Sequence, residues 1–142
     1  MSYKNIPIPK ILVIDFDGTI YHEDHSIFPQ IGPLFPGARE FINRLYSEGY
    51  YILINTCRHG EAELLCKVKL FEDKISYHSV NQHAPHLILK YGNDTRKMAG
   101  SIYIDNKNMG GLPMTTTDHP FFKDKLIPSW SAIYNQIHND IG

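Results

Sequence analysis

The sequence predicts a three-layer α/β/α sandwich built around a mainly parallel sheet. Short apolar runs occupy residues 11–14 and 51–54, and a third run ends at Ile104. Runs of this kind are typical of strands that are buried on both faces of a parallel sheet. Segments with helical spacing separate them, and this alternation of strand and helix favours the parallel α/β class.

The first strand, ILVI at residues 11–14, is entered from Pro9 and ends at an acidic turn. A stretch with Pro and Gly follows at residues 29–37. The next segment predicts a helix because its apolar residues recur every three or four positions, and Gly49 stands where a C-terminal cap would. These apolar residues are Ala38, Phe41, Ile42 and Leu45.

The second strand, at residues 51–54, leads past Gly60 into a second helix that carries Leu64, Leu65, Val68 and Phe71. A weaker strand is predicted at residues 75–80 and a short helix at residues 84–89. The strand at residues 101–104 comes next, then a loop rich in Gly and Thr, and a last helix around Trp130, Ile133 and Ile137. The 142 residues predict one domain, residues 1–142.

The composition excludes several classes of function. The formal net charge of −1 gives no reason to expect a general nucleic-acid or membrane binder. The two cysteines form no short-spaced pair, which indicates reduced thiols and, with no apolar leader at the N-terminus, a cytoplasmic protein. Pairs such as His22 and His25 have spacings seen in zinc sites, but no cysteine pair supports them.

Three strands are followed by polar residues that can carry chemistry. Asp15 and Asp17 follow the first strand, Thr56 the second, and Asp105 the strand at residues 101–104. Since parallel strands end at the same edge of a sheet, these side chains are expected to converge where α/β folds bind ligands. The two aspartates are able to share a hard cation there, although an Asx turn closing the strand explains them equally well in isolation.

The segment DFDGTI, which begins at Asp15, resembles the first motif, DxDGT, of the haloacid dehalogenase-like (HAD) superfamily of phosphohydrolases. The resemblance continues in order: ILINT ends at Thr56, Lys97 stands ahead of the fourth-motif strand, and IYIDN contains Asp105. The segments TCR and IDNKNMGGLP further resemble a subgroup of small bacterial and phage HAD proteins. Many members of that subgroup are described only as hydrolases of unassigned substrate.

The resemblance implies a magnesium-dependent phosphatase that acts through an aspartyl-phosphate. Asp15 would be the nucleophile and Asp17 the general acid and base. Mg²⁺ would be held by Asp15, Asp105 and the main-chain carbonyl of Asp17. Thr56 would donate a hydrogen bond to the phosphate, and Lys97 would place a positive charge beside it.

Other interpretations of these residues remain open. Thr56 has the character of a helix N-cap, and Lys90 is a rival to Lys97. Arg58 has a planar fork that suits a phosphate or carboxylate of the substrate, but a surface ion pair explains it as well. Asn106 stands where the subgroup has a second acid, which would weaken metal binding and favours, as an alternative, a feebly active phosphate-binding module.

The segment at residues 21–35 is long enough for a flap but too short for the cap domain that selects small substrates in many HAD enzymes. The sequence therefore predicts a capless member with an open site. A small phosphorylated substrate is the main expectation. An open site also permits a nucleic-acid end as substrate, or a second subunit that covers the site.

Overall fold

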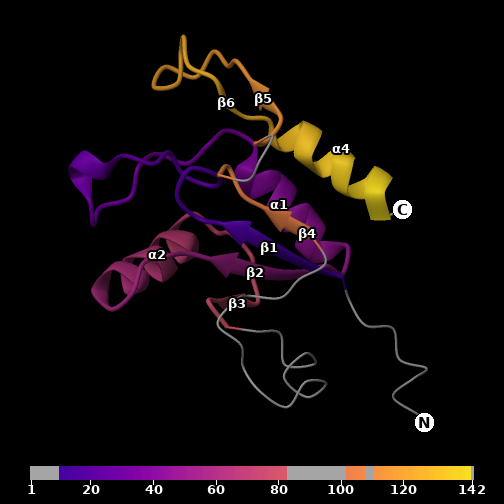
Figure 1. Ribbon diagram of the computed structural model, residues 1–142, viewed down its shortest axis with the longest axis horizontal. Helices are drawn as coiled ribbons and strands as arrows, with labels where there is room; N and C mark the ends of the chain where they lie inside the picture. The colour runs from indigo at the N-terminus through magenta and orange to yellow at the C-terminus, as the bar shows by residue number, and fades with distance from the viewer. Residues whose placement is uncertain (1–9, 83–101, 108–110, 142) are drawn as a thin grey trace.

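The computed structural model describes residues 10–82, 102–107 and 111–141, and a parallel sheet lies at the centre of these ranges (Figure 1). Its four strands are arranged in the order β3-β2-β1-β4. They are β1 (Ile11–Asp15), β2 (Tyr51–Asn55), β3 (Ser79–Val80) and β4 (Ile102–Ile104). Every adjacent pair is parallel, which confirms the predicted α/β class.

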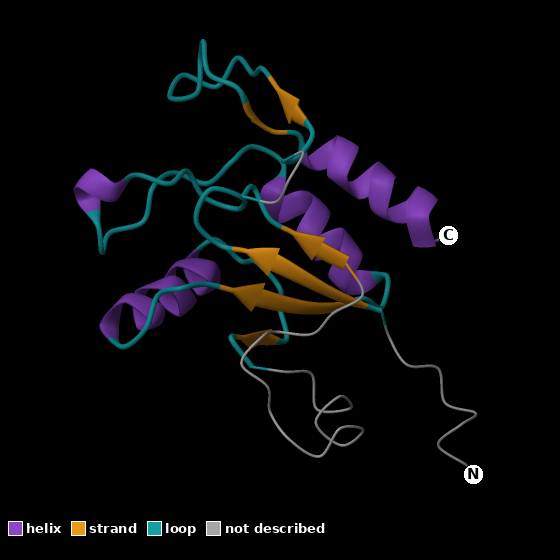
Figure 2. Ribbon diagram, viewed as in Figure 1, coloured by secondary structure: helices purple, strands orange, loops and turns teal. Residues whose placement is uncertain are grey.

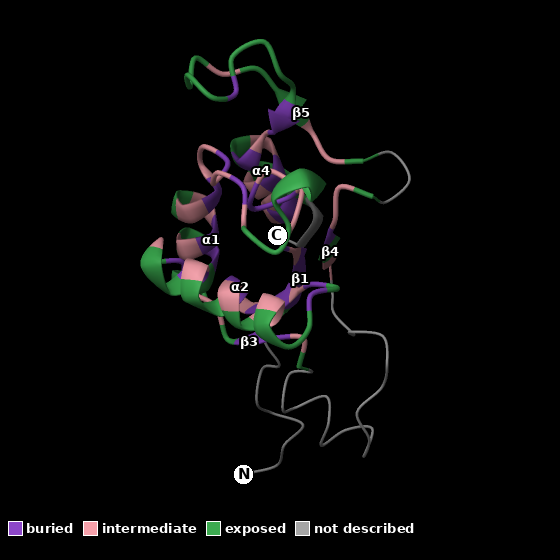
Figure 3. Cartoon of the chain, turned by 90° about the vertical axis from the view of Figure 1, so that its left-hand side faces the viewer, coloured by how far each residue is buried: buried purple, intermediate pink, exposed green. Residues whose placement is uncertain are grey.

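Helices α1 (Ala38–Ser47), α2 (Glu61–Glu72) and α4 (Trp130–Ile141) flank the sheet (Figure 2). Side chains from all three helices share one buried cluster with Leu12 and Ile14 of β1, and Figure 3 places these helices beside the sheet. Ile11 and Val13 point to the opposite face and are also buried, as the alternation of a strand requires. The helix predicted at residues 84–89 lies outside the described residues.

The strand order places β1 at the point where the chain changes direction across the sheet. From β1 the chain proceeds to β2 and β3 on one side, and β4 then pairs with β1 on the other side. Parallel α/β sheets bind their ligands beyond the carboxyl ends of the strands at such a point. Asp15 pairs with Asn55, and Ile14 pairs with Ile104, so that Asp105 follows β4 at the same edge.

Strand β3 is shorter than the prediction of residues 75–80. Only Ser79 and Val80 pair with β2. The amide of Ile75 bonds to the carbonyl of Leu70, and the amide of Ser76 bonds to the side chain of Asn43. Because these amides are used by helix α2 and helix α1, this part of the segment does not join the sheet.

Two further segments extend from the body of the fold (Figure 1). The arm at residues 21–35 contains a three-residue 3₁₀ helix, η2 (His25–Ile27). The loop predicted after Asp105 instead contains an antiparallel pair, β5 (Met114–Thr115) and β6 (Ile127–Pro128). No helix in the described ranges is both long and apolar enough to cross a lipid bilayer.

Candidate active site

The chain turns sharply directly after β1. The amide of Phe16 bonds to the carbonyl of Asn55 at 3.0 Å, and the amide of Gly18 bonds to the carbonyl of Tyr21 at 2.7 Å. Gly18 has a positive φ of 88°, a conformation that favours glycine. A β-carbon at Gly18 would lie 2.5 Å from Nδ2 of Asn106. The turn therefore fits closely against the residue that follows Asp105.

Thr19 joins the segments that form the site. Its hydroxyl donates to Oδ2 of Asp15 at 3.4 Å and accepts from the amide of Asn106 at 3.2 Å. Its carbonyl accepts a hydrogen bond from Nε1 of Trp130 in α4 at 3.0 Å. Thr19 is fully buried, so these bonds hold the turn against both β4 and the C-terminal helix.

Asp15 occupies a strongly perturbed electrostatic environment. The pKa of its carboxyl group is raised to about 7, chiefly by burial and then by the neighbouring carboxylates of Asp105 and Asp17, while Lys107 and the bond from Thr19 oppose the rise. A carboxyl group shifted this far, at the carboxyl end of a central strand, is a candidate functional residue. The repulsion from Asp105 shows that the two carboxylates lie close together, at the ends of adjacent parallel strands.

Asp17 is held by Arg58. Nε and Nη2 of Arg58 donate to the two carboxylate oxygens of Asp17 at 2.7 and 3.0 Å. The guanidinium also donates to the carbonyls of Pro29 at 2.6 Å and Gln30 at 3.4 Å, in the arm at residues 21–35. The sequence leaves a substrate anion and an ion pair open for Arg58. In this conformation the ion pair is formed, and the donors of Arg58 are used within the protein.

Thr56 is positioned by Asn81 at the end of β3. The amide of Thr56 donates to Oδ1 of Asn81, and Nδ2 of Asn81 donates to the carbonyl of Thr56, each at 2.8 Å. The hydroxyl oxygen of Thr56 accepts from the amide of Arg58 at 3.0 Å. A hydroxyl that accepts here still has its own proton to donate, which is the property expected of a phosphate-binding threonine.

The side chains around Asp15 offer oxygen ligands that suit a hard divalent cation. The repulsion between Asp15 and Asp105 would be relieved by a positive ion between them. Oδ1 of Asn106 is buried and has no hydrogen-bond partner among the described residues. Within those residues, no three side chains of His, Cys, Asp or Glu gather as a metal site. A cation here would therefore depend on two carboxylates, neutral oxygens and water, and Asp17 would contribute its main-chain carbonyl.

The structure does not place the lysine that the sequence predicts for the site. Lys97 and its rival Lys90 lie outside the described residues, so that neither is placed. Lys107, which sequence reasoning did not select, is a cation close enough to Asp15 to oppose the rise in its pKa. Its Nζ lies 3.5 Å from Oε1 of Glu23. The sequence signal that could have identified Lys107 is its position two residues after Asp105.

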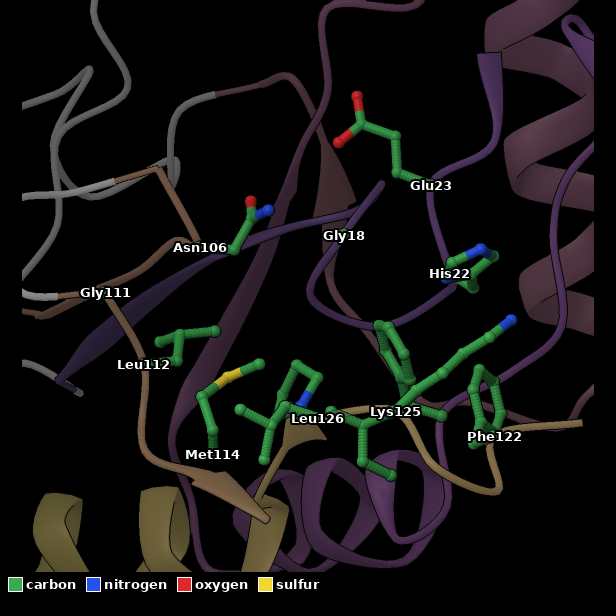
Figure 4. Close-up of a pocket in the computed structure, with 13 residues that line it drawn as sticks. Gly18, His22, Glu23, Asn106, Gly111, Leu112, Met114, Phe122, Lys125 and Leu126 are labelled. Carbon is green, nitrogen blue, oxygen red and sulfur yellow. The ribbon is translucent and has the colours of Figure 1, made fainter. Parts of the chain in front are cut away.

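Two clefts flank the turn at Gly18. One, of about 390 Å³, is lined by Gly18 and Asn106 on one side and by apolar residues of the β5–β6 segment, such as Met114 and Leu126, on the other (Figure 4). The other cleft, of about 420 Å³, is lined by Asp17, Arg58 and Lys107 together with residues of the arm. Of these two clefts, only the second has Asp17 in its wall.

Comparisons with protein families and with curated proteins find no match to this chain. Among solved structures, a conserved protein from Bacteroides thetaiotaomicron matches 95% of this chain and 94% of its own length, with a TM-score of 0.71 and 24% identity. This likeness shows the fold. A D,D-heptose 1,7-bisphosphate phosphatase from B. bronchiseptica, solved with magnesium and phosphate, matches 50% of this chain and 48% of its own, with a TM-score of 0.40 and 15% identity.

Proposed function

We propose that this protein is a HAD-like phosphatase that hydrolyses a phosphomonoester with the help of Mg²⁺. The observation that supports the proposal most is the convergence of Asp15 and Asp105 at the carboxyl ends of adjacent parallel strands. Asp15 is also the first residue of the turn DFDGT. Phosphoryl transfer depends on positioning and charge stabilisation, which this arrangement supplies.

In the proposed reaction an oxygen of Asp15 attacks the phosphorus atom while the bond from phosphorus to the ester oxygen breaks. Asp17 gives its proton to the leaving oxygen and the alcohol departs. A water molecule then attacks the phosphorus of the aspartyl-phosphate and transfers a proton to Asp17, which restores both carboxyl groups and releases inorganic phosphate. Thr56 donates its hydroxyl hydrogen to a phosphate oxygen throughout.

Mg²⁺ bound by Asp15, Asp105 and the carbonyl of Asp17 would neutralise the charge that otherwise keeps a carboxylate away from a phosphate. The unpartnered oxygen of Asn106 would face this ion directly or through water. Lys97 remains part of the proposal as the cation beside the phosphate. Lys107 is a second candidate, because its charge already acts on Asp15.

A phosphate-binding module with feeble activity is the competing proposal. Two observations favour it: Asn106 replaces an acid at the candidate cation site, and the carboxylate of Asp17 is engaged by Arg58. The two proposals differ in turnover. They share the same binding residues, so that binding of phosphate alone does not separate them.

The deciding experiment measures release of p-nitrophenol from p-nitrophenyl phosphate, with and without Mg²⁺, by the wild-type protein and by Asp15→Asn. We expect Mg²⁺-dependent turnover that falls by more than about 10³-fold in Asp15→Asn. Asp118→Asn, a change at an exposed carboxylate of the β5–β6 segment, is the matched control and should retain full activity. Turnover that needs no metal, or that survives in Asp15→Asn, would refute the mechanism.

A further inference from the structure

The cleft beside Asp17 identifies where the leaving group of the ester would lie. In the proposed reaction the leaving oxygen must approach Asp17 to receive a proton. Asp17 lines the cleft of about 420 Å³ that also contains Phe28, Arg58 and Lys107. The cleft of Figure 4 lies on the other side of Gly18 and does not include Asp17 in its wall. The alcohol part of the substrate therefore belongs in the cleft that Asp17 lines.

Phe28 is the principal apolar side chain of this cleft. It is 59% exposed, although a single exposed phenylalanine is by itself an ordinary feature of protein surfaces. What distinguishes Phe28 is its support. The guanidinium carbon of Arg58 lies over the ring at 5.0 Å from the centroid, and Nη1 of Arg58 bonds to the carbonyl of the next residue, Pro29, at 2.6 Å.

Arg58 thereby fixes the ring of Phe28 relative to the catalytic carboxylate. The same guanidinium that covers one face of the ring holds both oxygens of Asp17, at 2.7 and 3.0 Å. The side chain of Arg58 is 5% exposed, so this linkage is packed in place. A ligand ring that stacks on the uncovered face of Phe28 would have the Phe28 ring and the Arg58 guanidinium between itself and Asp17.

The polar groups of the cleft suit a ligand with both a ring and hydroxyl groups. Glu23 accepts from Lys107 at 3.5 Å and lies 3.2 Å from Nε2 of His25, so the wall presents a carboxylate between an ammonium and an imidazole. Hydroxyl and amino groups of a ligand can bond to either kind of group.

We infer that the preferred substrate is a nucleoside 5′-monophosphate whose base stacks on Phe28 while its sugar spans the distance to Asp17. This inference rests on the proposed function, because it takes Asp17 as the proton donor to the 5′ oxygen. Hydrolysis breaks the bond between phosphorus and that oxygen, and the products are the nucleoside and inorganic phosphate. Aromatic side chains bind bases through stacking with little dependence on base identity.

The test compares AMP with ribose 5-phosphate, which presents the same type of ester without a base. We expect kcat/KM of the wild-type protein to be at least about tenfold higher for AMP, the scale of one stacked base. In Phe28→Leu, which keeps an apolar side chain but removes the ring, the ratio between the two substrates should fall towards one. Phe28→Trp should retain the ratio. Phe121→Leu changes an exposed ring of the β5–β6 segment and should leave the ratio as in wild type.

Failure of the inference and failure of the proposed function give different results. A wild-type ratio near one, or a ratio that is unchanged in Phe28→Leu, overturns the stacking inference while phosphatase activity stands. If no ester is hydrolysed, the proposed function fails. The stacking inference is then tested by calorimetric titration of the Asp15→Asn protein with AMP and with ribose 5-phosphate. Tighter binding of AMP supports the inference, and equal binding of the two ligands overturns it.

Discussion

Asp17 and Arg58, far apart in the sequence, form a bidentate ion pair in which both carboxylate oxygens accept N–H groups of one guanidinium. Arg58 is buried, whereas Asp17 keeps part of its surface in the cleft. This pair links the turn after β1, the arm at residues 21–35 and the start of the segment that leads into α2. It thus fixes the orientation of the Asp17 carboxylate relative to the cleft that this residue lines.

Replacing Arg58 should therefore destabilise the protein as well as change activity. Arg58→Met retains much of the side-chain volume but leaves Asp17 and two carbonyl groups without their donor. We expect the free energy of unfolding to fall by about 2–3 kcal/mol, somewhat less than for a fully buried pair because Asp17 is partly solvated. Urea denaturation measures this change. Arg44→Met, which removes a guanidinium stacked on Phe41 and Tyr134, is the control and should cost less than about 1 kcal/mol.

Gly18→Ala should damage the site more than a glycine change in the same backbone conformation elsewhere. The added carbon would meet Asn106 at 2.5 Å, in addition to the strain of an alanine at a φ of 88°. Gly49 has a φ of 97° with nothing within 4 Å of its added carbon, so that Gly49→Ala reports the backbone strain alone. We expect each variant to lose about 1 kcal/mol from the backbone. Only Gly18→Ala should also lose phosphatase activity, and equal activity in the two variants would contradict the close fit at Asn106.

Asp15 should titrate near neutral pH in the metal-free protein. Burial and the charge of Asp105 hold its pKa at about 7, so the carboxyl group is largely protonated at pH 6 and ionised at pH 8. Carbon-13 NMR of the labelled carboxyl group follows this directly. Asp105→Asn removes the second-largest cause of the shift and should lower the midpoint. A midpoint near 4 in the wild-type protein would show that Asp15 is better solvated than the structure indicates.

Asn106→Asp should make the protein more dependent on Mg²⁺. Without metal, a further carboxylate beside Asp15 and Asp105 adds repulsion and should lower the midpoint of thermal unfolding. With Mg²⁺ present, the added charge should strengthen binding and raise the midpoint more than in wild type. Thermal unfolding in EDTA and in millimolar Mg²⁺ separates the two effects. An identical response to Mg²⁺ in both proteins would argue against a cation site at this position.

His78 should make stability depend on acidity. Partial loss of solvent around its imidazole lowers the pKa of His78, and Nδ1 accepts the amide of Ile52 at 2.9 Å, while the ring stacks on Tyr46 and Tyr51. The folded protein therefore favours the neutral ring. The contribution of His78 to the free energy of unfolding is complete above the pKa of about 6.5 that the imidazole has in the unfolded chain, and it is lost as the pH falls through the lower pKa of the folded protein. His78→Gln should therefore flatten the decline in unfolding free energy between pH 7 and 5. A parallel decline in both proteins would assign it to other groups.

Much of the fold follows from local sequence patterns. The apolar runs at residues 11–14 and 51–54 become β1 and β2, and the helical spacing from Ala38 becomes α1, because each pattern buries one continuous surface. The β5–β6 pair was predicted as a loop. Its strands have two residues each and carry no alternation that a sequence pattern could reveal.

The sequence could predict which candidate site residues stand at strand ends. It could not predict the hydrogen-bond partners that come from distant parts of the chain. Asp15 and Asp105 converge because their strands are parallel neighbours, which the motif order already implies. The partners of Arg58 and Thr56 depend on how the arm and Asn81 fold back over the sheet edge. No spacing in the sequence encodes these contacts, so the engagement of Arg58 with Asp17 was one of two open interpretations.

The hydrogen bond from Trp130 to the carbonyl of Thr19 has a consequence for synthesis of the protein. Residues of the turn after β1 leave the ribosome early, but the indole that holds this turn belongs to α4 and emerges much later. A nascent chain that ends before Trp130 lacks this support. Under the proposed function, the site would therefore become competent only after Trp130 has packed against Thr19.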